Sequence, residues 1–309
     1  MPELPEVETV RAGLAPALID ATITDIEIFD SRSLKRHPGG TRDFVSTLTR
    51  AKILGVVRRG KFLWLPIEVA GQNRELALVG HLGMSGQMLL RARGEAEDKL
   101  TRIVIHVETK KGKSLEFRFI DQRLFGSLAI DELVDTDDGG PGGFTAGKGA
   151  KTTWLNKIPQ QAAHIRRDPL DENFDLDWVL SRLAKKSSGI KRVLLDQQTV
   201  SGIGNIYADE ALWLSKLHYD QPANSISKIK AKTLFENIRE ILARAVSQGG
   251  TSFDEQYKNV NGESGYFAVS LNAYGQTGLP CPRCSRPIRR DAWMNRGSHY
   301  CPNCQKLRG

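Results

Sequence analysis

The sequence predicts a multidomain α+β protein: an N-terminal helix with an antiparallel β-sandwich, a helical domain, and a zinc finger built on four cysteines. Three observations carry this prediction. Apolar residues alternate with polar ones over most of residues 21–130, as in half-buried strands. After about residue 170 the apolar spacing becomes helical, and the chain closes with two C-x2-C pairs. The 309 residues leave room for two or three domains of ordinary size.

The N-terminal segment is expected to form a helix that precedes the strands. Val7, Val10 and Leu14 recur at helical spacing, and Pro5 suits a first helical turn, where its missing N–H is no loss. The alternation that follows is clearest over residues 102–107, and glycine-containing breaks separate the strands. This arrangement is typical of an antiparallel sandwich.

Changes in composition along the chain predict four parts. The sandwich domain is expected over residues 1–135, and a flexible linker or insertion, glycine-rich in its first half, over residues 136–165. The helical domain is expected over residues 166–267, with a polar, glycine-containing loop at 249–265 that is a candidate lid. Residues 268–309 are expected to form the finger domain.

The linker contains a partial match to a phosphate-binding loop. Gly142 is followed after four residues by Gly147 and Lys148. The next residue is Gly149, where such a loop needs a metal-binding Ser or Thr, and no apolar strand runs into the motif. No nucleotide binding is therefore expected here.

Two features of the helical region bear on packing and binding. Asn205 follows a pair of glycines and is expected to cap the next helix, whose N-terminal amides favour a phosphate. An apolar stripe at helical spacing is expected to belong to the core. It consists of Ile229, Leu234, Ile238, Ile241 and Ala245.

The charge distribution indicates a polyanionic partner. The net charge is +8 with an isoelectric point near 9.3, and residues 281–309 contain seven Lys or Arg against one Asp. No run of about 18 apolar residues exists, so no membrane span is expected. The N-terminus lacks the basic start and apolar run of a secretion signal, and we expect a cytoplasmic protein.

All four cysteines of the protein lie in this basic segment. They are Cys281, Cys284, Cys301 and Cys304, spaced C-x2-C-x16-C-x2-C. Two such pairs supply the four tetrahedral ligands of one structural zinc ion, and disulfides are disfavoured in a reducing compartment. Four thiolates leave no open coordination position, so the zinc should support a hairpin that presents Arg289, Arg290 and Arg296.

The first residues offer a nucleophile. Removal of Met1 would expose the secondary amine of Pro2, and an α-amino group with a pKa near 8 is about 250-fold more often a free base than lysine. Such an amine forms an iminium ion with a sugar aldehyde carbon, which promotes elimination of neighbouring phosphates. Glu3 and Glu6 are close enough in the sequence to donate a proton and to orient the amine.

Several motifs in a fixed order resemble one known family, the formamidopyrimidine-DNA glycosylases. The motifs are residues 2–9 (PELPEVET), 60–62 (GKF), 81–86 (HLGMSG), 121–126 (DQRLFG), 196–208 (DQQTVSGIGNIYA) and the terminal cysteine pairs. The resemblance runs from residue 2 to about 305 and implies a helix–two-turn–helix domain in the helical region. It implies a bacterial base-excision repair enzyme, both glycosylase and AP lyase, that acts on damaged double-stranded DNA lying between its domains.

The resemblance also implies roles for single residues. Pro2 would be the Schiff-base nucleophile and Glu3 the proton donor in base loss, whereas Lys61 would serve β-elimination. The family assigns δ-elimination to the position of Arg296, but a phosphate contact suits an arginine better because it almost never releases its proton.

Five further residues are implied to bind DNA. Met84, Arg123 and Phe125 resemble the family's void-filling triad, which replaces the flipped nucleotide. Lys186 and Asn205 match positions that bind the DNA backbone.

Two segments depart from the family pattern. Residues 97–100 (EDKL) stand where relatives often have a DNA-contacting histidine, so no contact is assigned there. Gln276 stands where many relatives have an arginine.

The predicted reaction is excision of oxidised purines, such as 8-oxoguanine or formamidopyrimidines, followed by β,δ-elimination. One alternative is an endonuclease VIII-type enzyme for oxidised pyrimidines, although those usually begin Pro-Glu-Gly-Pro. The other alternative is a non-catalytic zinc-containing DNA-binding protein, which would not need Pro2, Glu3 and Lys61 together. We expect a monomer that is cytoplasmic and associated with the nucleoid when bound to DNA.

Overall fold

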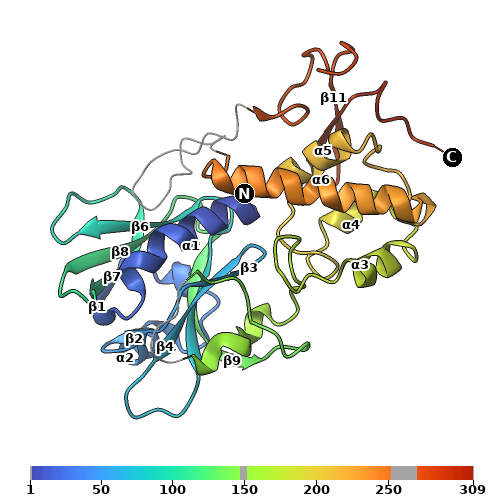
Figure 1. The fold of residues 1–309 in the computed structure, drawn as a ribbon. Helices are drawn as coiled ribbons and strands as arrows, with labels where there is room; N and C mark the ends of the chain where they lie inside the picture. The colour runs from blue at the N-terminus through green and yellow to red at the C-terminus, as the bar shows by residue number, and fades with distance from the viewer. Residues whose placement is uncertain (1, 147–151, 252–269, 309) are drawn as a thin grey trace. The chain divides into compact units, whose positions relative to one another are not determined.

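The computed structural model describes residues 2–146, 152–251 and 270–308 (Figure 1). These residues form two compact units. The N-terminal unit comprises residues 2–146 and 152–164 together with Thr251, and the C-terminal unit comprises residues 165–250 and 270–308. Our four-part division of the chain remains a prediction.

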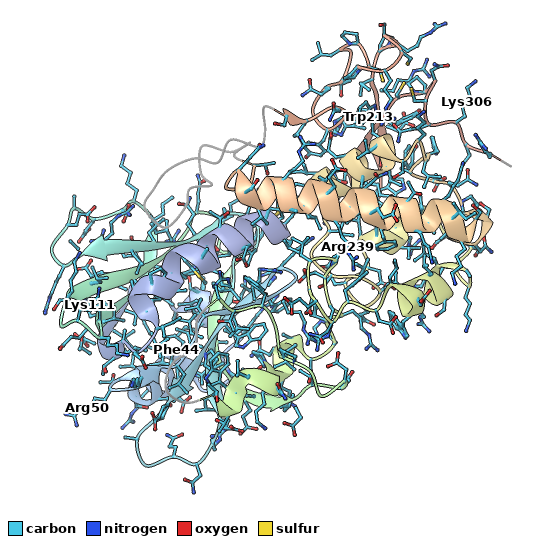
Figure 2. The ribbon with its side chains drawn as sticks, in the orientation of Figure 1. Phe44, Arg50, Lys111, Trp213, Arg239 and Lys306 are labelled. Atoms are coloured by element: carbon cyan, nitrogen blue, oxygen red, sulfur yellow. The ribbon has the colours of Figure 1, made fainter. Side chains whose placement is uncertain are left out.

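Helix α1 opens the N-terminal unit and packs on its sheet (Figure 1). It spans Leu4–Leu18, with Glu3 at the N-cap and proline in the first turn, as the sequence predicts. The helix ends because Ile19 is extended and Asp20 adopts a φ of 65°, which a helix cannot accommodate. The short helix α2, Gly40–Leu48, adds the buried Phe44 to the core of this unit (Figure 2).

Ten strands form an antiparallel sheet in the hydrogen-bonded order β10-β9-β5-β4-β2-β1-β7-β8-β6, with β3 paired to β4. The first strands are β1 (Thr22–Ile28), β2 (Lys52–Ile53), β3 (Val57–Arg59), β4 (Phe62–Glu68) and β5 (Leu76–His81). The others are β6 (Gly86–Ala92), β7 (Thr101–Glu108), β8 (Ser114–Asp121), β9 (Ser127–Asp135) and β10 (Lys157–Pro159).

The sheet folds over so that distant strands face each other across one core. A Cβ added to Gly80 in β5 would lie 2.1 Å from Met88 Cε in β6, although five strands separate β5 and β6 along the hydrogen-bonded path. Inward-facing residues such as Leu78, Ile105 and Phe117 fill the space between the layers. The predicted sandwich is therefore confirmed.

Much of the expected linker packs against the sheet. Phe144 exchanges two backbone hydrogen bonds with Arg58 (3.0 and 2.7 Å), and β10 pairs with the end of β9. Gly142 and Gly143 come so close to neighbouring backbone that a Cβ on either would meet a carbonyl oxygen within 2.4 Å. The prediction of a flexible linker is therefore wrong for these residues, because their glycines serve close packing. Residues 147–151 lie outside the described part.

The C-terminal unit contains α3 (Leu176–Leu183), α4 (Ile190–Leu194), α5 (Asn205–Leu214), α6 (Lys228–Ser247), β11 (Arg289–Trp293) and β12 (Arg296–Tyr300) (Figure 1). Helix α5 packs against both α6 and β12, so it joins the helical part to the finger. The predicted stripe on α6 is buried except for Ile229, which is exposed in the first turn of the helix. None of the helices in the described residues has the length and apolar character needed to cross a membrane.

Candidate active site and metal centre

Two buried carboxylates organise the N-terminus. Glu3 and Glu6 are 2% and 3% exposed, and Pro2 is also buried. One Glu6 oxygen accepts a hydrogen bond from the Glu3 backbone N–H at 2.8 Å. Its other oxygen accepts from the Thr251 N–H and hydroxyl at 2.8 and 2.9 Å. Glu6 therefore fixes the backbone beside Pro2 and ties it to Thr251, the third residue of the predicted loop at 249–265. The residues of that loop from 252 onward lie outside the description.

Lys61 lies in the two-residue turn between β3 and β4, beside Gly60 with a φ of 55°. Arg58, at the centre of β3, is 2% exposed and donates to Glu8 in α1 at 2.9 Å and to the Gly60 carbonyl at 3.2 Å. Loss of either partner would leave an unpaired buried charge, which strongly destabilises a folded protein. The Arg58–Glu8 ion pair therefore holds the turn against the helix. The elements that carry Glu3 and Lys61 are thus fixed to each other.

The predicted void-filling side chains stand on two loops. The Met84 loop comprises residues 82–85, and the Arg123 loop comprises residues 122–126. Met84 and Phe125 are 41% and 46% exposed, which is unusual for large apolar side chains and excludes a role in the core. The Arg123 guanidinium lies 5.0 Å from the centre of the Phe125 ring, so the pair forms one cationic and aromatic surface.

His81, at the end of β5, is held neutral beside these loops. Burial lowers the pKa of His81 to about 4, and positive charges nearby act in the same direction. The charges belong to Arg36, Lys35 and Lys61. His81 Nδ1 accepts a hydrogen bond from the Gly83 N–H at 3.2 Å, as a neutral ring can.

The lowered pKa of His81 predicts acid sensitivity of the N-terminal unit. The unfolded chain takes up the proton near pH 6.5, whereas the folded unit resists it until about pH 4. The stabilisation is therefore complete above pH 6.5 and is lost as the pH falls toward 4, with a loss of about 2 kcal/mol between pH 7 and pH 5. Urea unfolding at both pH values should show this loss in the wild type and a smaller one in His81→Gln; equal losses would contradict the assignment.

In the C-terminal unit, Lys186 and Asn205 occupy different environments. Lys186 Nζ donates to Asp196 at 2.9 Å and to Thr199 at 3.2 Å. Burial acts to raise the pKa of Asp196, but the hydrogen bonds from Lys186 and Thr199 outweigh it and the pKa is lowered. The sequence suggests that Asn205 caps α5, but this prediction is wrong, because Gly204 is the N-cap. Its amide nitrogen instead donates to the Gly297 carbonyl at 3.0 Å, beside Arg296.

Arg296 is exposed at the start of β12, directly after a tight turn. The turn residues Met294 and Asn295 both have positive φ, the conformation that two-residue hairpins require. The buried Lys191 donates to the Gly297 carbonyl at 3.2 Å and pairs with Asp209 of α5 at 2.6 Å. The backbone that follows Arg296 is therefore anchored to the helical part of the same unit.

The four cysteines converge as the sequence predicts. Their sulfur atoms all lie within 4.8 Å of one another, and Cys284 Sγ is 3.5 Å from Cys301 Sγ and 3.6 Å from Cys304 Sγ. A zinc–sulfur distance of about 2.3 Å gives a tetrahedron with edges of about 3.8 Å, so these thiolates fit one zinc ion. Trp213 of α5 donates to Cys281 Sγ at 3.4 Å and packs under the finger (Figure 2). This is a structural zinc site.

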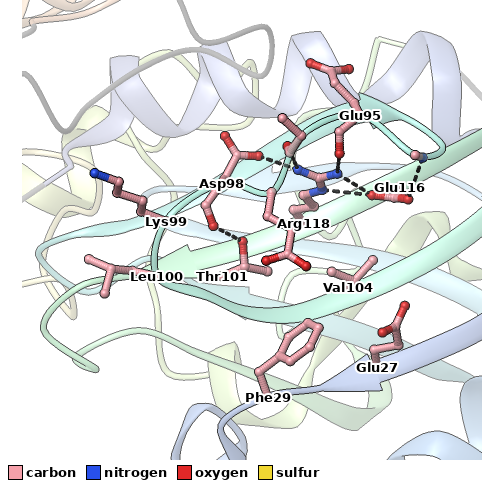
Figure 3. Close-up of a pocket in the computed structure, with 13 residues that line it drawn as sticks. Glu27, Phe29, Glu95, Asp98, Lys99, Leu100, Thr101, Val104, Glu116 and Arg118 are labelled. Atoms are coloured by element: carbon pink, nitrogen blue, oxygen red, sulfur yellow. Dashed lines mark hydrogen bonds and ion pairs between the residues drawn. The ribbon is translucent and has the colours of Figure 1, made fainter.

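The segment that departs from the family pattern is held by ion pairs. Arg118, 3% exposed in β8, donates to the carbonyls of Glu95 and Ala96 and to the carboxylate of Asp98 (Figure 3). It also pairs with Glu116 at 2.6 Å, and the whole group borders a depression of about 680 Å³. The Asp98 and Glu116 carboxylates here pair with Arg118 and hold the loop to β8.

The structure adds functional candidates that the sequence reading missed. Lys35 Nζ donates to the Leu124 carbonyl at 2.6 Å, which places a cation on the Arg123 loop. His81 and Asp121 each begin a motif of the family resemblance, HLGMSG and DQRLFG, and this position could have identified them as functional candidates. Nothing in the sequence around Lys35 indicates its position, because 89 residues separate it from Leu124.

Comparison with known proteins agrees with this arrangement. Residues 1–128 match the formamidopyrimidine-DNA glycosylase N-terminal domain, residues 165–256 the H2TH domain of the same enzymes, and residues 278–307 the zinc finger found in FPG and IleRS.

Two relatives and two solved structures illustrate the similarity. The formamidopyrimidine-DNA glycosylase of Leifsonia xyli subsp. xyli is 52% identical over 99% of this chain and 100% of that protein. The one of Kineococcus radiotolerans is 48% identical over 99% and 98%. A Lactococcus lactis FPG mutant in complex with Fapy-dG containing DNA superposes with a TM-score of 0.79 at 29% identity, covering 99% of this chain and 100% of that chain. Lactococcus lactis Fpg with an abasic site containing DNA gives 0.78 at 29%, covering 98% and 99%. The chain belongs to the formamidopyrimidine-DNA glycosylase family.

Proposed function

We propose that this protein excises oxidised purines from duplex DNA with the Pro2 amine as nucleophile and then cleaves the strand by β,δ-elimination. It is a DNA-formamidopyrimidine glycosylase of base excision repair by its relationship to enzymes of that name. The single observation that supports the roles of individual residues is the buried N-terminus, where Glu6 orients the backbone that joins Pro2 to the Glu3 carboxyl group.

The first step forms a bond between the Pro2 nitrogen and C1′ of the damaged nucleotide. The bond from C1′ to the base breaks, and the base leaves with the electron pair and takes a proton from Glu3. The Pro2 nitrogen then loses its proton, and the C1′–O4′ bond opens with protonation of O4′ to give an iminium ion. Because the positive nitrogen accepts electrons, loss of a C2′ proton expels the 3′ phosphate, and later loss of a C4′ proton expels the 5′ phosphate.

Four polar or cationic side chains are assigned different roles in this series of reactions. Lys61 would assist β-elimination and bind phosphate, and the anchoring of its turn to α1 through Arg58 supports this role. Arg296 and Asn205 lie together at Gly297 in the C-terminal unit, where they are suited to one phosphate group. Lys186 would add a further backbone contact.

Extrusion of the base is assigned to Met84, Arg123 and Phe125. Their exposed side chains would fill the space left by the flipped nucleotide and offset part of the cost of unstacking, which is a few kcal/mol. We also propose that the protein acts as a monomer in the cytoplasm and associates with the nucleoid when bound to DNA.

Phe125→Ala and Arg296→Ala should separate extrusion from phosphate binding. Phe125→Ala should slow excision from duplex DNA by about tenfold, because part of the few kcal/mol needed for unstacking is no longer offset, and should affect a preformed abasic site less. Arg296→Ala should weaken binding to every duplex and lower the slope of log affinity against log salt by about one. A changed salt slope with normal excision in Phe125→Ala would show that the ring does not act as a wedge.

The proposed function is tested by borohydride trapping with two duplexes, one with 8-oxoguanine opposite cytosine and one with an oxidised pyrimidine. A covalent adduct that forms more efficiently with 8-oxoguanine is expected. A higher yield with the pyrimidine would favour the endonuclease VIII-type alternative. Tight binding to both duplexes without an adduct would favour a non-catalytic DNA-binding protein.

A further inference from the structure

We propose that Asp121 and Ser85 are positioning residues that lock the Met84 loop and the Arg123 loop into one rigid wedge. The inference rests on the proposed function and concerns how the void-filling side chains are held. Asp121 is fully buried and Ser85 is 4% exposed, so neither side chain is available to touch DNA. Any effect they have on the reaction must be transmitted through the loops.

The Asp121 carboxylate accepts hydrogen bonds from both loops. One oxygen accepts from the Ser85 hydroxyl at 2.5 Å and from the Arg123 N–H at 3.2 Å. The other oxygen accepts from the Gly126 N–H at 2.7 Å. The Ser85 oxygen in turn accepts from the Arg123 N–H at 3.1 Å, so the two loops share one buried polar cluster.

The backbones of the two loops also meet directly. Gly83 has a φ of 62°, and a Cβ there would lie 2.5 Å from the Phe125 carbonyl carbon and 2.6 Å from the Gly126 nitrogen. A Cβ on Gly126 would lie 2.8 Å from the His81 carbonyl oxygen. The glycines thus permit the close approach, and the Asp121 cluster holds it.

Asp121 is itself fixed on its main-chain side. Its N–H donates to the Leu100 carbonyl at 3.3 Å, and its carbonyl accepts from Arg102 Nε at 2.8 Å. It also stands opposite Gly86 in the register of β6 and β8. The carboxylate therefore projects from the rigid end of the sheet and not from a loop.

A lock of this kind is needed because the wedge side chains are exposed. Packing cannot hold Met84 and Phe125 in place, since both are more than 40% exposed. Without backbone restraint, ordering the two loops at the moment of insertion would cost conformational entropy. Hydrogen bonds to one buried carboxylate remove that cost in advance, which is preorganisation of a binding surface.

The test uses three variants: Asp121→Asn, Ser85→Ala and the double variant that combines them. Glu116→Gln is the control to which they are compared. Glu116 is a matched control because it is another buried carboxylate of β8 that accepts from an arginine and from a loop N–H, but it bonds to neither wedge loop. Each protein is assayed for excision from an 8-oxoguanine duplex, for cleavage of a preformed abasic duplex, and for unstacking of a 2-aminopurine placed beside the lesion.

Asp121→Asn should reduce excision by about tenfold and Ser85→Ala by about threefold, with a parallel loss of the 2-aminopurine signal. Abasic cleavage should change less than threefold, and the double variant should resemble Asp121→Asn because both residues act in one cluster. Glu116→Gln should lower the thermal midpoint without changing the fluorescence signal. If Asp121→Asn does not fold, Ser85→Ala alone decides the question.

Equal losses of excision and abasic cleavage, or normal unstacking in both single variants, would overturn the lock. Failure of the proposed function is distinguishable, because it would appear as a wild-type protein that forms no borohydride adduct. An active wild type with unaffected variants refutes only the positioning role.

Discussion

Pro2→Gly is expected to abolish most borohydride trapping and to reduce base excision by at least about a hundredfold. Glycine leaves a primary amine, whose Schiff base is neutral until it is protonated, whereas the proline nitrogen gives a permanently charged iminium ion. Glycine also frees the backbone next to Glu3, and a displacement of about 1 Å can cost a hundredfold in rate. The measurement is trapping on an 8-oxoguanine duplex together with binding to the same duplex by gel shift.

Binding should survive in Pro2→Gly, because the residues that we assign to phosphate contact are untouched. Pro5→Ala is the matched control, since it alters the first turn of α1 without changing the terminal amine, and it should trap normally. A protein that retains extra residues before Pro2 should be as inactive as Pro2→Gly. Wild-type adduct yield in Pro2→Gly would refute the nucleophile.

Cys301→Ser is expected to release the zinc ion and unfold the finger. Structural zinc sites contribute about 10–16 kcal/mol of binding free energy in finger peptides, and loss of one thiolate removes a ligand that no other group can replace. Arg296 begins β12, the strand that leads directly into Cys301, so it would lose its fixed position when the finger unfolds. DNA affinity should therefore fall by about tenfold or more. Zinc content by atomic absorption and affinity by fluorescence anisotropy check these outcomes.

The N-terminal unit should stay folded in Cys301→Ser, since its core is separate and contains no cysteine. Pro302→Ala, adjacent to the ligand in the same turn, should keep both zinc and affinity. A full equivalent of zinc in Cys301→Ser, or unchanged affinity, would show that the four cysteines do not form the predicted site.

Local patterns in the sequence were sufficient for much of this architecture. Helical spacing at Val7, Val10 and Leu14 predicted α1, and the C-x2-C pairs predicted a zinc site whose sulfur atoms do converge. These predictions succeed because side-chain periodicity and ligand spacing are properties of short segments. The family resemblance then supplied the site residues, because its motifs are long and occur in one order.

Local spacing failed where contacts distant in the sequence decide the conformation. The glycines at 142 and 143 read as a flexible linker, yet they allow the chain to pack on β3. Asn205 reads as a helix cap, but the carbonyl of Gly297, 92 residues away, takes its side chain. Ile229 has the spacing of a core residue but remains exposed because it lies in the first turn of α6.

The sequence by itself predicted the chemistry: a proline amine exposed by removal of Met1 beside two glutamates, a lysine for elimination and four zinc ligands are proposed from residue types, their order and the family resemblance. Only the tertiary structure decided how these groups are held. The Glu6 carboxylate bonds to Thr251, 245 residues away, and the Asp121 carboxylate bonds to Ser85, 36 residues away. No local pattern in the sequence encodes such partners. The physical reason is that a buried carboxylate must find its hydrogen-bond donors wherever the folded chain supplies them.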